Sequence, residues 1–227
     1  MSSVLSNTNH RDSQDRLERW FFTFIAAEFL VVSMIGFAPN SIAILTGDKT
    51  NPPPIIHVHA ALMFGWMLGF LAQAYLISVG RVRLHIQAGR ILFSIGVIIL
   101  LTFLYFSLFW PGEGFGRINT AMTVDRVGFF SLFLFLAFFY RKRDAQSHKR
   151  FILLATLVPL DAGLNRIAWL PSFGLPWATP PWMLIALSQL FLFDWLRMNR
   201  IHQATWFGGG LIAVFWLGMI LWQVFLA

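Results

Sequence analysis

The chain has 227 residues, of which 57% are hydrophobic and 12% are charged, and its mean hydropathy is +0.67. This composition leaves too little polar material for a soluble domain. The sequence contains no cysteine, which excludes disulfides, thiolate metal sites and covalent haem attachment through a Cys-x-x-Cys-His motif.

Apolar stretches along the chain predict an all-α, polytopic membrane protein with a bundle of seven transmembrane helices. A helix needs roughly 20 apolar residues to cross a bilayer, and lipid offers its backbone no other hydrogen-bonding partner. The predicted spans are residues 20–38, 55–78, 87–110, 119–140, 150–170, 181–197 and 204–226. Residues 1–19 are expected to form a short cytoplasmic polar tail, disordered or on the surface, and residues 20–227 a single transmembrane domain.

Lys and Arg are shared unevenly between the two ends of this bundle. With a cytoplasmic N-terminus, thirteen of the seventeen lie on the cytoplasmic side, and the other four are Lys49, Arg117, Arg126 and Arg166. The positive-inside rule then predicts a cytoplasmic N-terminus and a C-terminus outside. The net charge of +7 reflects this asymmetry and an attraction to membrane lipids, and does not indicate nucleic-acid binding.

Ionisable residues inside two spans gather in the outer half of the bundle. Asp125 and Arg126 lie in the fourth span, and Asp161, Asn165 and Arg166 lie in the fifth. Such groups cost several kcal/mol in lipid unless they face the interior and find partners. Asp125 and Arg126 point about 100° apart on a helix, so we expect pairs across helices with Asp161 and Arg166. The cluster is a structural salt-bridge network, an outward-facing polar pocket, or both.

His57 and His59 lie at the outer start of the second span, near the depth of Asp125 and Asp161. Residues two apart lie on opposite faces of a helix, so we expect only one of the two to face the bundle. His59 begins a stripe at helical spacing that continues through Met63, Trp66, Phe70 and Gln73. His57, His59, Asp125 and Asp161 are candidate catalytic groups. The two histidines are also candidate ligands of a divalent or transition metal such as zinc, iron or copper. A hydrogen-bonded packing role is the alternative.

Glu28 lies near the middle of the first span. A carboxyl group at this depth is expected to be neutral or hydrogen-bonded. It is either a proton-relay step or part of the structural polar network, with Gln73 or Gln189 as its partner.

His85 and His148 open the third and fifth spans at the cytoplasmic end. If these helices are neighbours, the two imidazoles approach a planar cofactor from opposite sides, which is the geometry of a bis-His haem. Arg81, Arg83 or Arg150 would then bind the propionates. The alternative is that both histidines, like His202, are ordinary polar residues at the membrane interface.

Several motifs resemble those of a large, poorly characterised family of bacterial multi-pass membrane proteins. They are His59-Ala-Ala-Leu62-Met63, Trp66, Gly80-Arg81, Leu84-His85, Gly89 and His148-Lys149-Arg150. The resemblance covers most of residues 55–210, including Asp161 and residues 202–206. It implies a helical protein of the bacterial inner (plasma) membrane, and it implies no particular activity.

A more distant resemblance is to the b-type dihaem transmembrane reductases, in which four histidines on four consecutive helices bind two haems. His59, His85 and His148 match three of these histidines. The fourth has no counterpart, because residues 119–140 contain no histidine. At most one bis-His haem, between His85 and His148, is therefore implied.

Three functional hypotheses follow. The first is an electron-transfer protein that binds haem b and exchanges electrons with quinone. The second is a membrane-embedded, metal-dependent enzyme whose outer His/Asp site acts on a lipid-soluble substrate. The third is a non-catalytic subunit or assembly factor of a membrane complex. No P-loop, dinucleotide fingerprint or Gly-x-Ser-x-Gly motif is present.

Overall fold

The computed structural model describes residues 2–109 and 123–225, with side chains described from Trp20 onward. All regular structure in these residues is helical, and it comprises α1 (Ser2–Leu45), α2 (Pro54–Ser78), α3 (Val82–Phe109), the π-helix η2 (Val124–Phe129), α5 (Phe130–Tyr140), α6 (Ala145–Leu157), α7 (Leu160–Leu164), α8 (Thr179–Met198), the π-helix η3 (Thr205–Gly209) and α9 (Gly210–Phe225). The all-α prediction is confirmed for the described residues.

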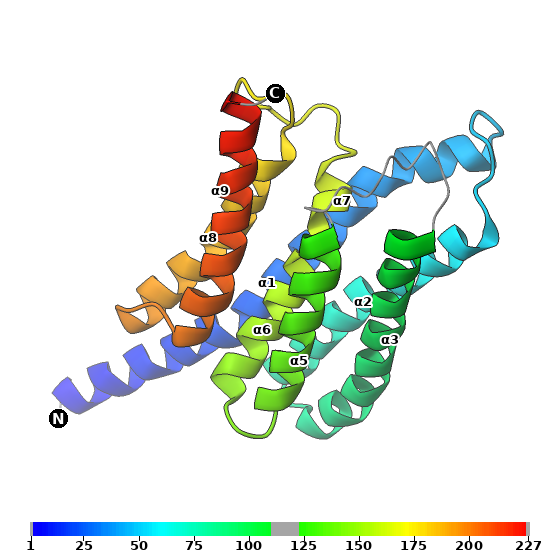
Figure 1. Ribbon diagram of the computed structural model, residues 1–227. Helices are drawn as coiled ribbons and strands as arrows, with labels where there is room; N and C mark the ends of the chain where they lie inside the picture. Colours follow the sequence, from blue (N-terminus) through cyan, green and yellow to red (C-terminus); the bar gives the residue numbers. More distant parts are fainter. Residues whose placement is uncertain (1, 110–122, 226–227) are drawn as a thin grey trace.

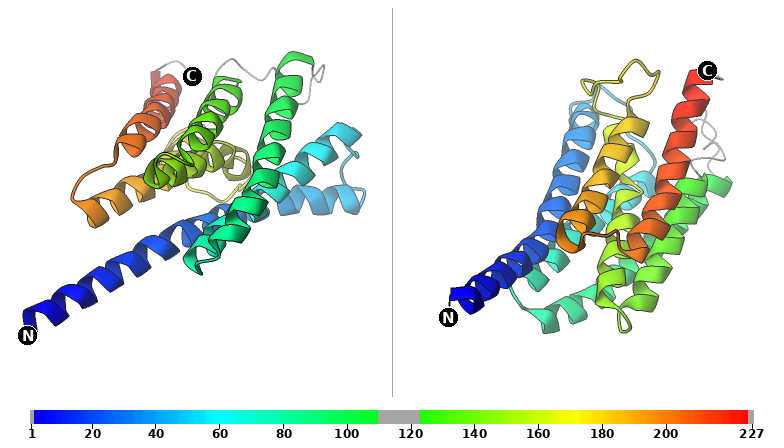
Figure 2. Two further views of the ribbon diagram at one scale, coloured as in Figure 1. Left: turned by 90° about the horizontal axis from the view of Figure 1, so that it is seen from below. Right: turned by 90° about the vertical axis from the view of Figure 1, so that its left-hand side faces the viewer.

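The long helical segments run in alternating directions through one bundle, and α7 continues α6 in the same direction (Figure 1). The turns at residues 79–81, 141–144 and 199–204 lie at one end, which we call the basic end because Arg81, Arg143 and Arg200 lie in these turns. The loops at residues 46–53 and 165–178 lie at the opposite end. The first part of α1 projects beyond the other helices (Figure 2).

Among the described residues, four helical segments are long and apolar enough to cross a membrane, and they are Trp20–Leu45, Pro54–Ser78, Val82–Phe109 and Thr205–Phe225. Large apolar side chains on their outer faces, such as Phe24, Leu101 and Val214, are exposed. Such faces suit lipid, because a bilayer removes the cost of exposing apolar surface to water. These helices indicate a membrane protein.

Several helix boundaries differ from the prediction, and α3 and α6 begin earlier than expected, at Val82 and Ala145. The backbone of the segment expected as a polar tail is helical and continuous with the first span, which ends at Leu45. The fifth predicted span is divided into α6 and α7 at Pro159, which has no N–H and whose ring clashes with a carbonyl one turn earlier. It ends at Leu164 instead of at residue 170. Residues 110, 119–122 and 226 of the predicted spans lie outside the described residues.

Helix α6 lies at the centre of the bundle and packs against α1, α5, α7, α8 and η3. Its residues from Leu153 to Leu157 are all buried. Trp66 of α2 is fully buried and donates a hydrogen bond from Nε1 to the hydroxyl of Thr156, with a distance of 3.2 Å. This bond joins the α2–α3 pair to the centre of the bundle.

Close contacts between helices depend on glycine at several positions, and Gly36 and Gly96 are two of them. A Cβ atom on Gly36 of α1 would lie 2.2 Å from the carbonyl oxygen of Gly163 in α7. A Cβ atom on Gly96 of α3 would lie 2.7 Å from the ring of Trp66. Small residues at helix interfaces let backbones approach closely, which is a common way of packing helices in membranes.

We predict that Gly36→Ala lowers the thermal unfolding temperature of the purified protein in detergent. The added methyl group must push α1 away from α7, and overpacking of this kind costs about 1–3 kcal/mol. Gly218→Ala in α9 is the matched control, because a Cβ there meets nothing within 4 Å. Equal unfolding temperatures for the two variants would contradict the close approach of α1 and α7.

Candidate functional site

An ion pair joins two helices in the half of the bundle away from the basic end. Arg126 of η2 donates a hydrogen bond to Oδ2 of Asp161 in α7, with a distance of 2.8 Å. Asp161 is buried, and the Arg126 side chain is 27% exposed. The expected pairing between the fourth and fifth predicted spans is therefore present in this contact.

Asp125 lies beside this pair and is fully buried. Neither of its carboxyl oxygens has a hydrogen-bond partner, and Oδ1 of Asp161 also lacks one among the described residues. Asp125 and Arg126 both belong to the π-helix η2, a local widening of the helix that is frequent at functional sites. The cluster thus holds two carboxyl groups and one guanidinium group in a largely dry interior.

Arg166 and Asn165 lie at the exposed edge of this cluster. Arg166 donates to the carbonyl oxygen of Ala162 at 2.5 Å and lies over the ring of Phe37, 4.5 Å from its centre. Asn165 accepts a hydrogen bond from Thr179 at 3.3 Å. Within the described part of the chain Arg166 makes no ion pair with an acid, so Arg126 alone holds Asp161.

The two outer histidines face different partners. His57 is exposed, and its Nε2 lies 2.8 Å from Oδ1 of Asn51. The Nδ1 of His59 lies 2.7 Å from the hydroxyl of Thr102, which itself donates to the carbonyl oxygen of Ile99. His59 Nδ1 is therefore the donor. The prediction that only His59 faces the bundle is confirmed, and Trp66, Phe70 and Gln73 of its stripe are buried.

These positions do not converge on one metal ion. His57 is hydrogen-bonded to Asn51 and His59 to Thr102, so the two proposed metal ligands face different partners. No group of three or more His, Asp or Glu side chains in the described residues has the geometry to hold a metal. Of the four candidate catalytic residues, the structure brings Asp125 and Asp161 together, and His59 lies close enough to Arg126 for their charges to interact.

We predict that Arg126→Gln strongly destabilises the protein and that Arg166→Gln does so only weakly. Removing Arg126 leaves Asp161 buried without its counter-charge, which costs about 3 kcal/mol or more. Arg166→Gln removes mainly a cation–π contact, worth about 0.5–1 kcal/mol when exposed. Thermal unfolding in detergent measures both variants, and an equal loss would show that the pair with Asp161 is not special.

A second pair of titratable residues meets at the basic end. The imidazole rings of His85 in α3 and His148 in α6 lie 6.4 Å apart, centre to centre, at an interplanar angle of 81°. The Nδ1 of His148 donates to the carbonyl oxygen of Ala137 at 2.7 Å, which fixes its tautomer and leaves Nε2 without a proton. The Nδ1 of His85 is buried and has no hydrogen-bond partner among the described residues.

Some polar side chains around these histidines are free to bind a ligand, and others already have hydrogen-bond partners. Gln73 of α2 is buried beside Gly89, and its Oε1 has no hydrogen-bond partner in the described part of the chain. Arg81 and Arg83 are exposed within one turn of His85. Arg150 corrects the sequence prediction, because its guanidinium group is bonded to Asp194 and Gln146 and is not free for a propionate.

The buried ion pair of Arg150 with Asp194 was not predicted. Both side chains are almost completely buried, and the Arg150 guanidinium contacts the carboxylate through two nitrogens. Asp194 also accepts from the Thr205 hydroxyl at 2.5 Å and from the His202 backbone N–H at 3.0 Å. One carboxylate therefore holds α6, α8 and η3 together.

We predict that Asp194→Asn lowers the unfolding temperature in detergent sharply. The substitution keeps the shape and leaves Arg150 buried without a counter-charge, which costs about 3–5 kcal/mol. The double variant Arg150→Met/Asp194→Leu should lose less than the single variant, because no charge is then left unpaired. Asp48→Asn in an exposed turn is the control. A double variant less stable than Asp194→Asn would contradict this reasoning.

Glu28 is paired with Gln189, one of the two partners predicted from the sequence. Its carboxylate accepts a hydrogen bond from the amide of Gln189 in α8, with a distance of 2.7 Å. This contact joins α1 to α8 at an exposed position. It gives Glu28 a structural role, and within the described residues no second acid or histidine extends it into a relay.

Comparisons of the chain with protein families, with curated proteins and with solved structures find no match. The two resemblances based on sequence motifs therefore stay predictions. The geometry of the sites carries the functional argument.

Proposed function

We propose that the protein is a membrane electron-transfer protein that binds one haem b between His85 and His148. The observation that carries this proposal is the meeting of the two imidazoles at the basic end, 6.4 Å apart between ring centres. A nitrogen–metal bond of an imidazole is about 2 Å long. The two imidazoles would be the residues that hold the iron of a bound haem.

The hydrogen bonds of the two histidines support the same role. A ligating histidine usually donates its other ring N–H to a carbonyl or carboxylate group, which fixes its orientation. His148 has this arrangement with Ala137 O. The unpartnered Nδ1 of His85 and Oε1 of Gln73 are buried polar atoms that a bound group would account for.

Residues of the chain would position the haem in distinct ways. His85 and His148 would hold the haem iron, and Arg81 and Arg83 would bind the propionates at the membrane surface. Haem b with two imidazole ligands supplies a one-electron carrier.

We further propose seven transmembrane helices in a bacterial inner membrane, with the basic end in the cytoplasm. The four apolar helices and the gathering of Lys and Arg at one end support this topology. A phosphatase fused after Ala227 should then be active, and one fused after Arg143 should be inactive. The reverse pattern of activities would overturn the orientation.

We predict that protein expressed with added haem precursor is coloured and shows a Soret band at one haem per chain. Both His85→Ala and His148→Ala should lose the band, because each removes one axial ligand. His57→Ala should keep the Soret band, since His57 lies at the opposite end of the bundle, where it is hydrogen-bonded to Asn51. The measurements are an absorbance spectrum and a pyridine-haemochrome assay on the purified protein.

Two results would contradict the haem proposal. One is a colourless protein that leaves the spectrum of titrated haemin unchanged. The other is a Soret band that persists in the variant that lacks both His85 and His148. The outer cluster of Asp125, Arg126 and Asp161 would then become the leading candidate site.

A further inference from the structure

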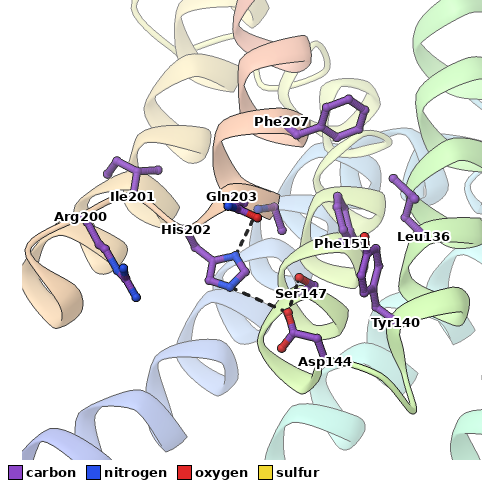
Figure 3. Close-up of a pocket in the computed structure, with 11 residues that line it drawn as sticks. Leu136, Tyr140, Asp144, Ser147, Phe151, Arg200, Ile201, His202, Gln203 and Phe207 are labelled. Atoms are coloured by element: carbon purple, nitrogen blue, oxygen red, sulfur yellow. Dashed lines mark hydrogen bonds and ion pairs between the residues drawn. The ribbon is translucent and has the colours of Figure 1, made fainter.

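An open pocket of about 710 Å³ lies at the basic end, where the α5–α6 turn meets the α8–α9 turn. This volume is in the range of small-molecule sites, about 300–1,000 Å³. The pocket has an apolar wall of Leu136, Tyr140, Phe151 and Phe207 and a polar wall that includes Asp144, Ser147 and His202 (Figure 3). It therefore suits a ligand that is partly apolar and partly polar.

The apolar wall is largely aromatic. The rings of Tyr140 and Phe151 are stacked, with centres 5.7 Å apart and an interplanar angle of 27°. Phe151 also stacks on Phe133, so it is held in place from the interior side. Figure 3 shows Tyr140 and Phe151 side by side, with Leu136 next to them. Flat rings of this kind favour a flat ring in the ligand.

Asp144 supplies a fixed acceptor on the polar wall. Its carboxylate caps α6 by accepting from the backbone N–H of Gln146 at 2.9 Å and from the hydroxyl of Ser147 at 2.5 Å. Partial burial acts to raise the pKa of Asp144, but these hydrogen bonds outweigh it and hold the pKa below its usual value. The group is therefore a carboxylate at neutral pH, with hydrogen-bonding capacity left on Oδ2.

His202 supplies a fixed donor opposite this acceptor. The backbone N–H of Ala204 donates to Nδ1 of His202 at 3.1 Å, so the proton of the neutral ring lies on Nε2. Burial and the charge of Arg150 lower the pKa of His202, which keeps the ring neutral. Its Nε2 lies 4.0 Å from Oδ2 of Asp144, too far for a direct hydrogen bond.

We propose that this pocket binds the ring of a lipid-soluble quinol, with one ring hydroxyl between Nε2 of His202 and Oδ2 of Asp144. A hydroxyl group both accepts and donates, so it can accept from the imidazole N–H and donate to the carboxylate. The aromatic ring packs between Tyr140 and Phe207, and the tail extends toward the lipid past Leu136. Binding at this pocket goes beyond the proposed haem and does not require it.

Other ligand classes fit the pocket less well. Arg200 also lines the pocket and would attract an anionic lipid headgroup, whereas the Asp144 carboxylate would repel it, so such a headgroup meets one favourable and one unfavourable charge there. The oxidised quinone offers only carbonyl acceptors, so it can bond to His202 but not to Asp144. The pocket should therefore prefer the reduced form.

The test is the binding of decylbenzoquinol to the full-length protein in detergent under argon, measured by titration calorimetry. The quinol should bind saturably, and its dimethyl ether, which keeps the ring and tail but has no O–H donor, should bind roughly tenfold or more weakly. The oxidised decylbenzoquinone should also bind more weakly than the quinol. These comparisons need no variant of the protein.

Three variants assign the effect to the pocket. Asp144→Asn keeps an oxygen to cap α6 but removes the charge, and it should abolish the preference for quinol over quinone. His202→Asn keeps an acceptor near the Ala204 N–H but removes the Nε2 donor, and it should weaken quinol binding roughly tenfold. His57→Asn, at the opposite end, is the matched control and should bind as the unaltered chain does.

The proposal is overturned if quinol and dimethyl ether bind equally, if neither Asp144→Asn nor His202→Asn changes the affinity, or if a short-chain phosphatidylglycerol displaces the quinol. The measurement should be repeated in His85→Ala/His148→Ala. If this colourless double variant still binds quinol, the result supports quinol binding at the pocket. The haem proposal is then decided separately, by the absorbance measurements.

Discussion

The buried pair of Arg150 and Asp194 is the constraint on which the basic end depends. Two charges without solvent are tolerated only when they are paired and fully hydrogen-bonded, and here Thr205, His202 and Gln146 complete the bonding. The pair fixes α8 and η3 against the central helix α6. It thereby sets the distance between the α5–α6 and α8–α9 turns, from which the pocket proposed to bind a quinol is built.

On the other side of α6, a hydrogen bond between two uncharged side chains fixes the position of the neighbouring helices. Trp66 reaches Thr156 and packs on Phe130, while Gly96 leaves room for its ring. These contacts place α3 beside the α5–α6 pair, and as a result His85 faces His148. The haem proposal therefore depends on packing a few turns away from the histidines as well as on the histidines themselves.

Periodicity and depth were sufficient to predict part of this structure. Helical spacing identified His59 as the inward-facing histidine, and depth along the spans paired Arg126 with Asp161. Arg150 was misassigned because it stands among other basic residues, although Asp194 is a lone acid near the end of an apolar span and lies at a matching depth. The pocket could not be predicted, because no pattern in the sequence shows that the turn containing Asp144 meets the turn containing His202.

The ion pairs Arg126–Asp161 and Arg150–Asp194 have a consequence for biosynthesis. Arg126 precedes Asp161 by 35 residues, and Arg150 precedes Asp194 by 44. At about 5–20 residues per second, a ribosome leaves each arginine without its partner for roughly 2–9 s. An unpaired charge is costly in lipid, so the earlier helix carries this cost until the later one arrives.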